Sequence, residues 1–450
     1  MKKTICVISP YNTFSGYGVH SRLIIKSLLK YRDKYDIHLI GTPWGGCPDG
    51  FLNPNDPIDS EILSLNVPNN QLTFQPDISI HIAVPTDFQK IGKYSIGISA
   101  VTEATLCPPA FIEGANRIDH VIVPSEFSKK VLTETIIDKK DRQTGQVVGT
   151  VQCTTPVDVL FEGYDPDVYN VGNIVRGDLI QRLGAIKESF CYLFVGHWTN
   201  GTLGQDRKDV SGLIKTFLET FMKKSGKNRP ALILKTSGPG FSKVECDNVL
   251  DKIWQIKELI RDQSNFKGKF PSIYLINGEL SDSEMNTLYR HSKVKSFVTF
   301  QKGEAWGLPI AEFATTGKPI ICTGYSGPLD YLKPDHHVLL PAKLTNVDPS
   351  SANEFIPREG QWATVNYQLA SAMLVDVQKN YAKYLQKSRK SVKYMADNFS
   401  LPVMAERLVQ ILDDISLPVQ VGLKLPELVK KGSDHQKPTI KLPTLTKMTD

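Results

Sequence analysis

The chain has 450 residues, of which 41% are hydrophobic and 22% are charged. These values are typical of a globular protein with about two domains of ordinary size, and they argue against wholesale disorder. The net charge of +6 is mild for this length, so it permits an anionic partner without demanding nucleic acid.

The seven cysteines are scattered, odd in number and without a C-x-x-C pair. This pattern favours reduced thiols in a cytoplasmic protein over a disulfide framework or a zinc site. The N-terminus, MKKTICVISP, is too short for a signal peptide and is predicted to be the first strand. No apolar run reaches the roughly 18 residues that a transmembrane helix requires, so none is expected.

Most of the chain alternates between short apolar runs of strand length and segments with a helical pattern of apolar residues. This alternation predicts an α/β fold. Strands are expected at residues 4–9, 36–41, 76–83, 94–99, 189–196, 231–236, 273–278, 296–300 and 319–323.

A glycine pair follows the first strand. The next helix is expected from about residue 19 to residue 29, which places Gly16 and Gly18 at the strand-to-helix turn. Backbone N–H groups could approach an anion there, because glycine has no side chain and a helix N-terminus favours negative charge. A plain turn is the alternative interpretation. His20, on the first helical turn, is expected to be structural.

The first half has three further features. Glu103 follows the strand at 94–99 and is a candidate to bind a sugar or acceptor hydroxyl, although a plain loop acid would look the same. Trp44, in a glycine-containing loop, either packs inside that loop or forms a rim facing an acceptor. Ser125 is expected to cap a helix whose first turn holds Glu126.

Cations mark the start of the second half. Arg207 and Lys208 stand just ahead of a predicted helix, with Asp209 as its expected N-cap. Together with the positive end of that helix they could bind a diphosphate, or they could be a surface basic pair. Lys235 lies near the end of the strand at 231–236, where a lysine is costly unless it is paired, faces a ligand or snorkels to the edge.

The most informative stretch is residues 296–332, which predicts a strand, a loop, a helix, a second strand and a glycine-rich loop. Pro309 suits the first turn of the helix and Gly317 its C-terminal cap. Glu304 in the loop and Glu312 on the helix would both face the crevice at the carboxyl ends of the strands, where open α/β sheets bind ligands.

This stretch resembles the signature of retaining glycosyltransferases of the GT-B fold, in particular family four. Those enzymes carry two glutamates separated by seven residues, in a block that reads roughly E-G-F-G-L-P-x-x-E-A. The matching residues are Glu304, Trp306, Gly307, Leu308, Pro309 and Glu312. Two departures are visible, since Ala305 replaces the usual glycine and Phe313 the usual alanine.

The resemblance implies two Rossmann-like domains that face each other across a cleft, with a C-terminal helix crossing back to the first domain. Residues 1–170 would form the acceptor domain, residues 171–400 the donor domain and residues 401–415 the crossing helix. Residues 416–450 are rich in lysine and proline and lack a helical or strand period, so we expect an extended or disordered tail.

The resemblance also implies roles for individual residues. Glu304 would meet hydroxyls of the transferred sugar and Glu312 the nucleotide ribose, as carboxylates only accept hydrogen bonds. Lys208 would stabilise the leaving diphosphate. The remaining donor-binding candidates are Gly16, Gly18, Arg207, Lys235, Gly278 with the backbone after it for the nucleobase, Gly307 and Leu308, and the glycine loop with Gly324 and Gly327. Many relatives have a histidine near position 103, where this chain has Glu103.

The predicted function is transfer of a hexose from a UDP or GDP sugar to a hydroxyl, with retention of anomeric configuration. The expected acceptor is a polysaccharide or a lipid-linked glycan, with a hydroxylated base in DNA as a further option that no motif supports. No cofactor and no metal are expected, because no D-x-D motif occurs in the required context. A catalytically silent relative that binds glycan or nucleic acid is the alternative, and the oligomeric state stays open.

Overall fold

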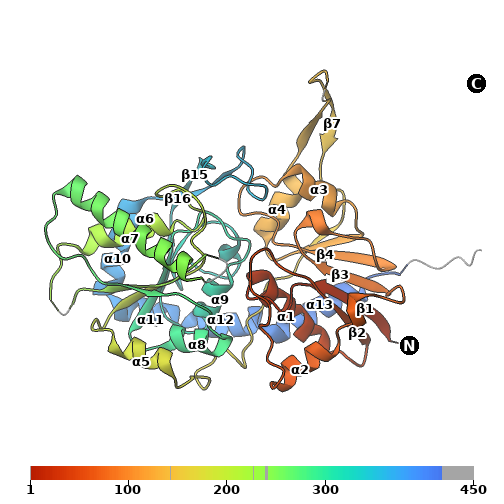
Figure 1. Ribbon diagram of the computed structural model, residues 1–450, viewed down its shortest axis with the longest axis horizontal. Helices are drawn as coiled ribbons and strands as arrows, with labels where there is room; N and C mark the ends of the chain where they lie inside the picture. The colour runs from red at the N-terminus through yellow and green to blue at the C-terminus, as the bar shows by residue number, and fades with distance from the viewer. Residues whose placement is uncertain (1, 142, 227, 239–241, 418–450) are drawn as a thin grey trace, which may run out of the picture. The chain divides into compact units, whose positions relative to one another are not determined.

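The computed structural model describes residues 2–141, 143–226, 228–238 and 242–417 (Figure 1). The tail expected over residues 416–450 therefore lies, except for its first two residues, outside the described part of the chain. Among the described helices, none is both long enough and apolar enough to cross a membrane.

The first domain is built on a parallel six-stranded sheet with the order β2-β1-β3-β4-β5-β8. The strands are β1 (Lys3–Ser9), β2 (Tyr35–Gly41), β3 (Ile78–Ile82), β4 (Tyr94–Ile98), β5 (His120–Val123) and β8 (Val157–Val159). The helices are α1 (Gly16–Leu29), α2 (Pro57–Ser64), α3 (Pro109–Ala115) and α4 (Glu126–Glu134), with short 3₁₀ turns at Pro68–Asn70 and Pro85–Asp87. The last five residues of β1 are all buried, as expected for a strand covered on both faces of a parallel sheet.

An unpredicted antiparallel hairpin extends from the first domain. It consists of β6 (Ile137–Lys140) and β7 (Val147–Val151), and it projects away from the sheet (Figure 1).

The second domain repeats the plan with the order β11-β10-β9-β12-β13-β14, again parallel throughout. The strands are β9 (Cys191–Val195), β10 (Ala231–Lys235), β11 (Ile273–Ile276), β12 (Val294–Thr299), β13 (Ile320–Thr323) and β14 (Val338–Leu340), and β15 (Ala342–Asn346) with β16 (Gln361–Val365) forms an antiparallel hairpin. The helices are α5 (Asp178–Ala185), α6 (Val210–Phe221), α7 (Lys243–Ser264), α8 (Asp282–Arg290), α9 (Leu308–Ala314), α10 (Tyr367–Lys379), α11 (Tyr381–Ser388) and α12 (Lys390–Phe399), with a 3₁₀ turn at Gly327–Asp330.

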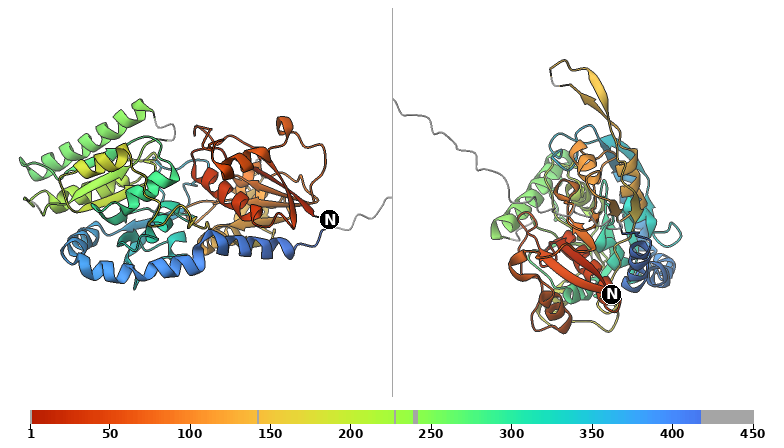
Figure 2. Two further views of the ribbon diagram at one scale, coloured as in Figure 1. Left: turned by 90° about the horizontal axis from the view of Figure 1, so that it is seen from below. Right: turned by 90° about the vertical axis from the view of Figure 1, so that its right-hand side faces the viewer.

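The last described helix, α13 (Leu401–Asp413), leaves the second domain and packs against α1 of the first, as the blue segment in Figure 2 shows. Its buried positions recur every three to four residues and so form one face, at Leu401, Met404, Ala405, Leu408, Val409 and Leu412. Each large apolar side chain buried in this way contributes about 1.5–3 kcal/mol. The predicted architecture, two Rossmann-like domains with a C-terminal helix that returns to the first, is confirmed.

The domains also meet at a second place, which we call the β4–hairpin junction: residues 101–105 after β4, the β15–β16 hairpin and Gly303. The Thr105 N–H donates to the Gln361 carbonyl oxygen, and the Gln361 N–H donates to Thr105 Oγ1, both at 2.8 Å. A small apolar cluster of Ala104, Val347, Ile356 and Trp362 lies beside these bonds.

Gly303 brings the two backbones into direct contact at this junction. A Cβ at Gly303 would overlap the carbonyl oxygen of Glu103, and a backbone oxygen cannot swing aside as a side chain can. We expect Gly303→Ala to lower the free energy of unfolding by about 1–3 kcal/mol, measured by denaturant titration. Gly184→Ala is the matched control, because a Cβ there meets open space on an exposed helix, and it should be neutral or slightly stabilising.

Candidate functional site

A cavity of about 930 Å³ lies between the two domains. Its walls come from the loops that follow the carboxyl ends of β1 to β4 and β8 in the first domain and of β9 to β12 in the second, and from the segment between β15 and β16. In each sheet the strand order reverses beside the first strand of the domain, β1 or β9. Such switch points open a crevice at the carboxyl edge of a sheet, so the two crevices face each other here.

The glycine pair after β1 is placed differently from the prediction. Helix α1 begins at Gly16 and not near residue 19, because Ser15 caps it: Ser15 Oγ accepts the Gly18 N–H at 2.9 Å. Gly16 lines the cavity. Gly18 is buried inside the first turn, its N–H is already bonded, and a Cβ there would overlap the Thr13 carbonyl. The glycine at position 18 is therefore explained by packing.

The loop between β9 and α6 carries the cations, and its helix cap also differs from the prediction. Asp209 occupies the N-cap position but has left-handed backbone angles, and its carboxylate accepts the Tyr367 hydroxyl at 2.7 Å instead of capping the helix. The capping acid is Asp206, whose carboxylate accepts the N–H of Val210 at 2.9 Å and the hydroxyl of Ser211 at 2.8 Å. Asp206 thereby fixes the positions of the residues that follow it.

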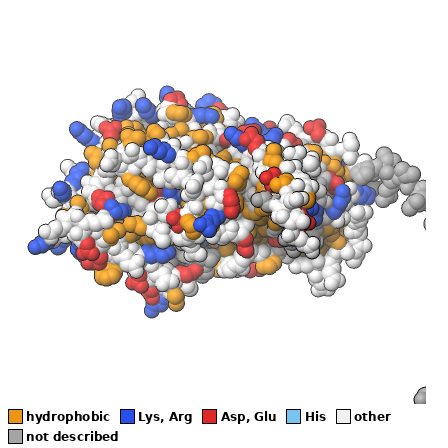
Figure 3. Space-filling model, turned by 90° about the horizontal axis from the view of Figure 1, so that it is seen from above, with side chains coloured by type: hydrophobic (Ala, Val, Ile, Leu, Met, Phe, Trp, Pro, Cys, Tyr) orange, Lys and Arg blue, Asp and Glu red, His pale blue; other side chains and the backbone are white. Residues whose placement is uncertain are grey.

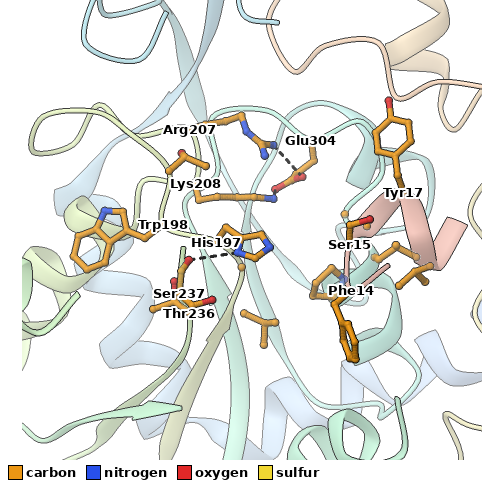
Figure 4. A pocket seen from close by; sticks show the side chains of 18 of the residues that line it. Phe14, Ser15, Tyr17, His197, Trp198, Arg207, Lys208, Thr236, Ser237 and Glu304 are labelled. Carbon is orange, nitrogen blue, oxygen red and sulfur yellow. Dashed lines mark hydrogen bonds and ion pairs between the residues drawn. The ribbon is translucent and has the colours of Figure 1, made fainter. Parts of the chain in front are cut away.

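Arg207, Lys208, Glu304 and Glu103 form a compact charge cluster that joins the domains. Arg207 NH1 lies 2.6 Å from Glu103 Oε1 and 3.6 Å from Glu304 Oε2, and Lys208 Nζ donates to Glu304 Oε1. Figure 4 shows Arg207 and Lys208 converging on Glu304 in the cavity. All four side chains are at most 21% exposed, so their charges interact through a largely dehydrated environment.

Burial and pairing act in opposite directions on the two cations. Burial would lower the pKa of Arg207, but the carboxylates of Glu103 and Glu304 outweigh it and raise that pKa above its ordinary value. Burial lowers the pKa of Lys208, and the neighbouring Glu304 only partly opposes this shift.

Lys235 ends β10, as predicted, and lines the same cavity. Burial lowers its pKa to about 8, with Glu279 acting in the opposite direction. Close by, His197 Nδ1 lies 3.3 Å from the carbonyl oxygen of Ser237, which Figure 4 shows beside Thr236 and Trp198. The cavity wall of the second domain is therefore rich in cationic and polar groups.

Residues 296–332 fold as expected. The glycine-rich loop that follows β13 holds the loop at Glu304 in place. The Glu304 N–H donates to Ser326 Oγ at 2.9 Å, and the Gly327 N–H donates to the Glu304 carbonyl at 3.0 Å. A Cβ at Gly327 would overlap the Ala305 carbonyl, so this glycine is needed for contact with the chain itself. Gly324 packs near the Leu340 carbonyl in the same way, and neither glycine lines the cavity.

Gly307, Leu308 and Glu312 lie where the predicted helix begins. Gly307 has a φ of 93° at the N-cap of α9 and Leu308 is the first helical residue; both line the cavity. Glu312 accepts a hydrogen bond from the Tyr289 hydroxyl at 2.8 Å, and the neighbouring Tyr169 also favours the ionised carboxylate. Burial, followed by the charge of Asp282, raises the pKa of Glu312 to about 7.

Gly278 follows β11 with a φ of 112°, a conformation that favours glycine. The cavity wall continues directly after it with Glu279 and Leu280. The structure therefore places the backbone after β11 at the edge of the site.

Sequence reasoning missed a buried pair that lines the cavity. His20 Nδ1 lies 3.2 Å from Glu162 Oε1, and both side chains line the cavity. Burial lowers the pKa of His20 to about 4 and raises that of Glu162 to about 8, where Glu304 and Glu312 add to the shift. The sequence signal for Glu162 was an acid directly after the apolar run of β8, but its burial depends on residues far along the chain.

An aromatic pair forms part of the first domain's wall. Trp44 stacks on Tyr17 with ring centroids 3.9 Å apart, and both residues line the cavity. The sequence predicts that Trp44 either packs inside its loop or forms a rim of the site. The structure supports elements of both, because this side chain packs on a neighbour and also faces the cavity. Among the described residues, no group of three or more His, Cys, Asp or Glu side chains is arranged to hold a metal ion.

Comparison with known proteins bears on the fold. The sequence matches no family model and no curated protein. Among solved structures, sucrose-phosphate synthase from Thermosynechococcus elongatus is 11% identical over 92% of this chain and 98% of its own, with a TM-score of 0.57. HepE of Anabaena, solved in complex with UDP and glucose, is 13% identical over 91% of this chain and 99% of its own, with a TM-score of 0.55.

A glycosyltransferase from Rickettsia africae is 14% identical over 91% of this chain and 97% of its own, with a TM-score of 0.54. The fold is GT-B. At identities of 11–14% the likeness is one of fold, and it spans nearly the full length of both chains in each comparison.

The role of Asp206 can be tested directly. We expect Asp206→Ala to lower the free energy of unfolding by about 1–2 kcal/mol, because the first N–H groups of α6 lose their acceptor. Thermal or chemical denaturation would measure this loss. Asp178→Ala, which removes an exposed acid from the first turn of α5, is the control and should change stability much less.

Proposed function

We propose that the protein is a glycosyltransferase that uses a UDP sugar as its donor. The observation that carries this proposal is the pairing of Arg207 and Lys208 with Glu304 at the carboxyl edge of the second sheet, inside an interdomain cavity that Lys235 also lines. Three cations suit a diphosphate, and carboxylates suit sugar hydroxyls. The binding of UDP and glucose by HepE, a protein of the same fold, supports this choice of donor.

The chemistry follows from the charges. When the bond between sugar and diphosphate breaks, negative charge develops on the leaving phosphate oxygens. Cations fixed beforehand in a dehydrated cleft stabilise that charge without having to reorganise. This role would fall to Arg207, Lys208 and Lys235. Glu304 would bind hydroxyls of the sugar, and Glu312, with its neighbouring tyrosines, would lie at the ribose.

The finer assignments rest on the resemblance of residues 296–332 to family-four enzymes. On that basis we propose a hexose as the transferred sugar and retention of its anomeric configuration. The acceptor would be a glycan hydroxyl, on a polysaccharide or a lipid-linked chain, held against Tyr17 and Trp44 of the first domain. DNA is the less favoured acceptor, since Figure 3 shows basic side chains interspersed with acidic and apolar ones on the face it presents.

The first test is calorimetric titration with UDP, GDP and ADP. We expect UDP to bind most tightly, and Lys208→Ala to weaken its binding by about tenfold or more because a charge-assisted contact is lost. Lys223→Ala removes an exposed lysine just after α6 and should leave the affinity unchanged. Failure of all three nucleotides to bind would favour the alternative of a catalytically silent, glycan-binding protein.

The low pKa of Lys235 makes donor binding sensitive to pH. Lys235 is protonated below its pKa of about 8 and loses its charge above it. Only the charged form attracts a diphosphate, so UDP affinity should fall as the pH rises from about 7 to about 9. Lys235→Arg should flatten this decline, because a guanidinium keeps its charge throughout.

Glu162 ionises in the same range and needs its own control. Its pKa of about 8 means that it gains negative charge near the donor as the pH rises, which pushes the affinity in the same direction. A decline that persists in Lys235→Arg but disappears in Glu162→Gln would assign the effect to Glu162 and contradict the role of Lys235.

A further inference from the structure

We propose that Glu103 competes with the donor diphosphate for Arg207, and that donor binding releases Glu103 to bind the acceptor hydroxyl. This inference rests on the proposed function of the cleft. It assigns to one carboxylate of the first domain two successive partners, a guanidinium and then a hydroxyl. The reaction would thereby acquire an order, in which the nucleotide sugar binds before the acceptor.

The partners of Arg207 are the first support. Its NH1 atom is 2.6 Å from Glu103 and only 3.6 Å from Glu304, so Glu103 is the nearer of the two carboxylates. Lys208, in contrast, bonds Glu304, which belongs to its own domain. Only the Glu103–Arg207 pair of this cluster joins the two domains, and it does so across the cavity that both residues line.

The second support is that the Glu103 backbone is held by the second domain while its side chain stays partly exposed. The carbonyl of Glu103 is pressed against Gly303, and Thr105, two residues on, exchanges two hydrogen bonds with Gln361. The Glu103 side chain remains 21% exposed. When Arg207 takes another partner, the carboxylate can therefore turn about its own side-chain bonds and stay within the cleft.

Charge makes the exchange reasonable. A guanidinium can form a two-pronged pair with a phosphate as readily as with a carboxylate, and a diphosphate carries more charge than Glu103 does. The released Glu103 carboxylate would lie beside the cavity and would no longer be paired with Arg207. A carboxylate only accepts hydrogen bonds, which suits it to orient the hydroxyl of an incoming sugar.

The competition has a measurable cost to donor affinity. If Arg207 must leave Glu103 before it binds phosphate, the observed affinity equals the intrinsic one reduced by the fraction of Arg207 that is free. Removing the carboxylate removes this reduction. Loss of an acidic side chain from the site should then strengthen nucleotide binding, which is the opposite of what loss of a binding residue does.

The test is UDP titration of wild type, Glu103→Gln and the control Glu113→Gln, an exposed acid on α3. We expect Glu103→Gln to bind UDP about three- to tenfold more tightly and the control to match wild type. Glu103→Asp, whose shorter side chain draws the carboxylate away from Arg207, should be intermediate. Thermal unfolding of each variant would confirm that the fold is intact.

A double-mutant cycle separates competition from general electrostatics. Removing a negative charge near a diphosphate strengthens binding to some extent even without a shared partner. In an Arg207→Gln background no competition exists, so Glu103→Gln should change UDP affinity by less than about twofold there. If Glu103→Gln strengthens UDP binding as much in the Arg207→Gln background as it does when Arg207 is intact, the proposal is overturned.

The outcomes also distinguish this proposal from the function on which it rests. If wild type binds UDP and Glu103→Gln binds it equally or more weakly, the exchange is overturned while the donor site stands. If wild type binds no nucleotide, the proposed function fails and the exchange fails with it.

Discussion

The need to pair buried charge determines how this cleft is built. Arg207 and Lys208 are at most 19% exposed, and an isolated cation so far removed from water would cost several kcal/mol. Carboxylates from both domains meet this need, Glu304 from the same domain and Glu103 from the other. The charges therefore act on domain placement as well as on the site, because moving the domains apart would leave Arg207 without its nearer partner.

Backbone topology brings these groups within reach of one another. Each domain places its loops at the carboxyl edge of a parallel sheet, next to the strand where the order reverses, and α13 and the β4–hairpin junction hold the two edges face to face. Glycines permit the closest approaches, as at Gly303 against Glu103 and Gly327 beneath Ala305. Backbone contacts thus hold the two domains together at the edge of the cleft, and charged side chains meet inside it.

The sequence predicted the architecture and the strand–loop–helix block around Glu304 because local patterns determine both. It placed the start of α1 too late, because a glycine pair reads as a turn and the cap at Ser15 was overlooked. It predicted Asp209 as the cap of α6, whereas the carboxylate that accepts from the first turn is that of Asp206, and the left-handed backbone of Asp209 is not visible in the sequence. Glu162 was missed because its burial and its neighbours come from distant segments. Pairing partners such as Glu103 and Arg207 are likewise set by tertiary structure, which a single sequence does not display.

The β15–β16 hairpin is tied to the loop that carries the cations. The cations and Glu304 belong to loops that follow strands of the main sheet. The hairpin lies outside that sheet. The segment that connects its two strands, which includes Asn353 and Phe355, lines the same cavity. Ser351 in this segment donates to the carbonyl oxygens of Gln205 at 2.6 Å and Asn200 at 3.3 Å. The hairpin and the loop that carries the cations therefore form one connected unit, so a change in the length of the hairpin would also reach Arg207 and Lys208.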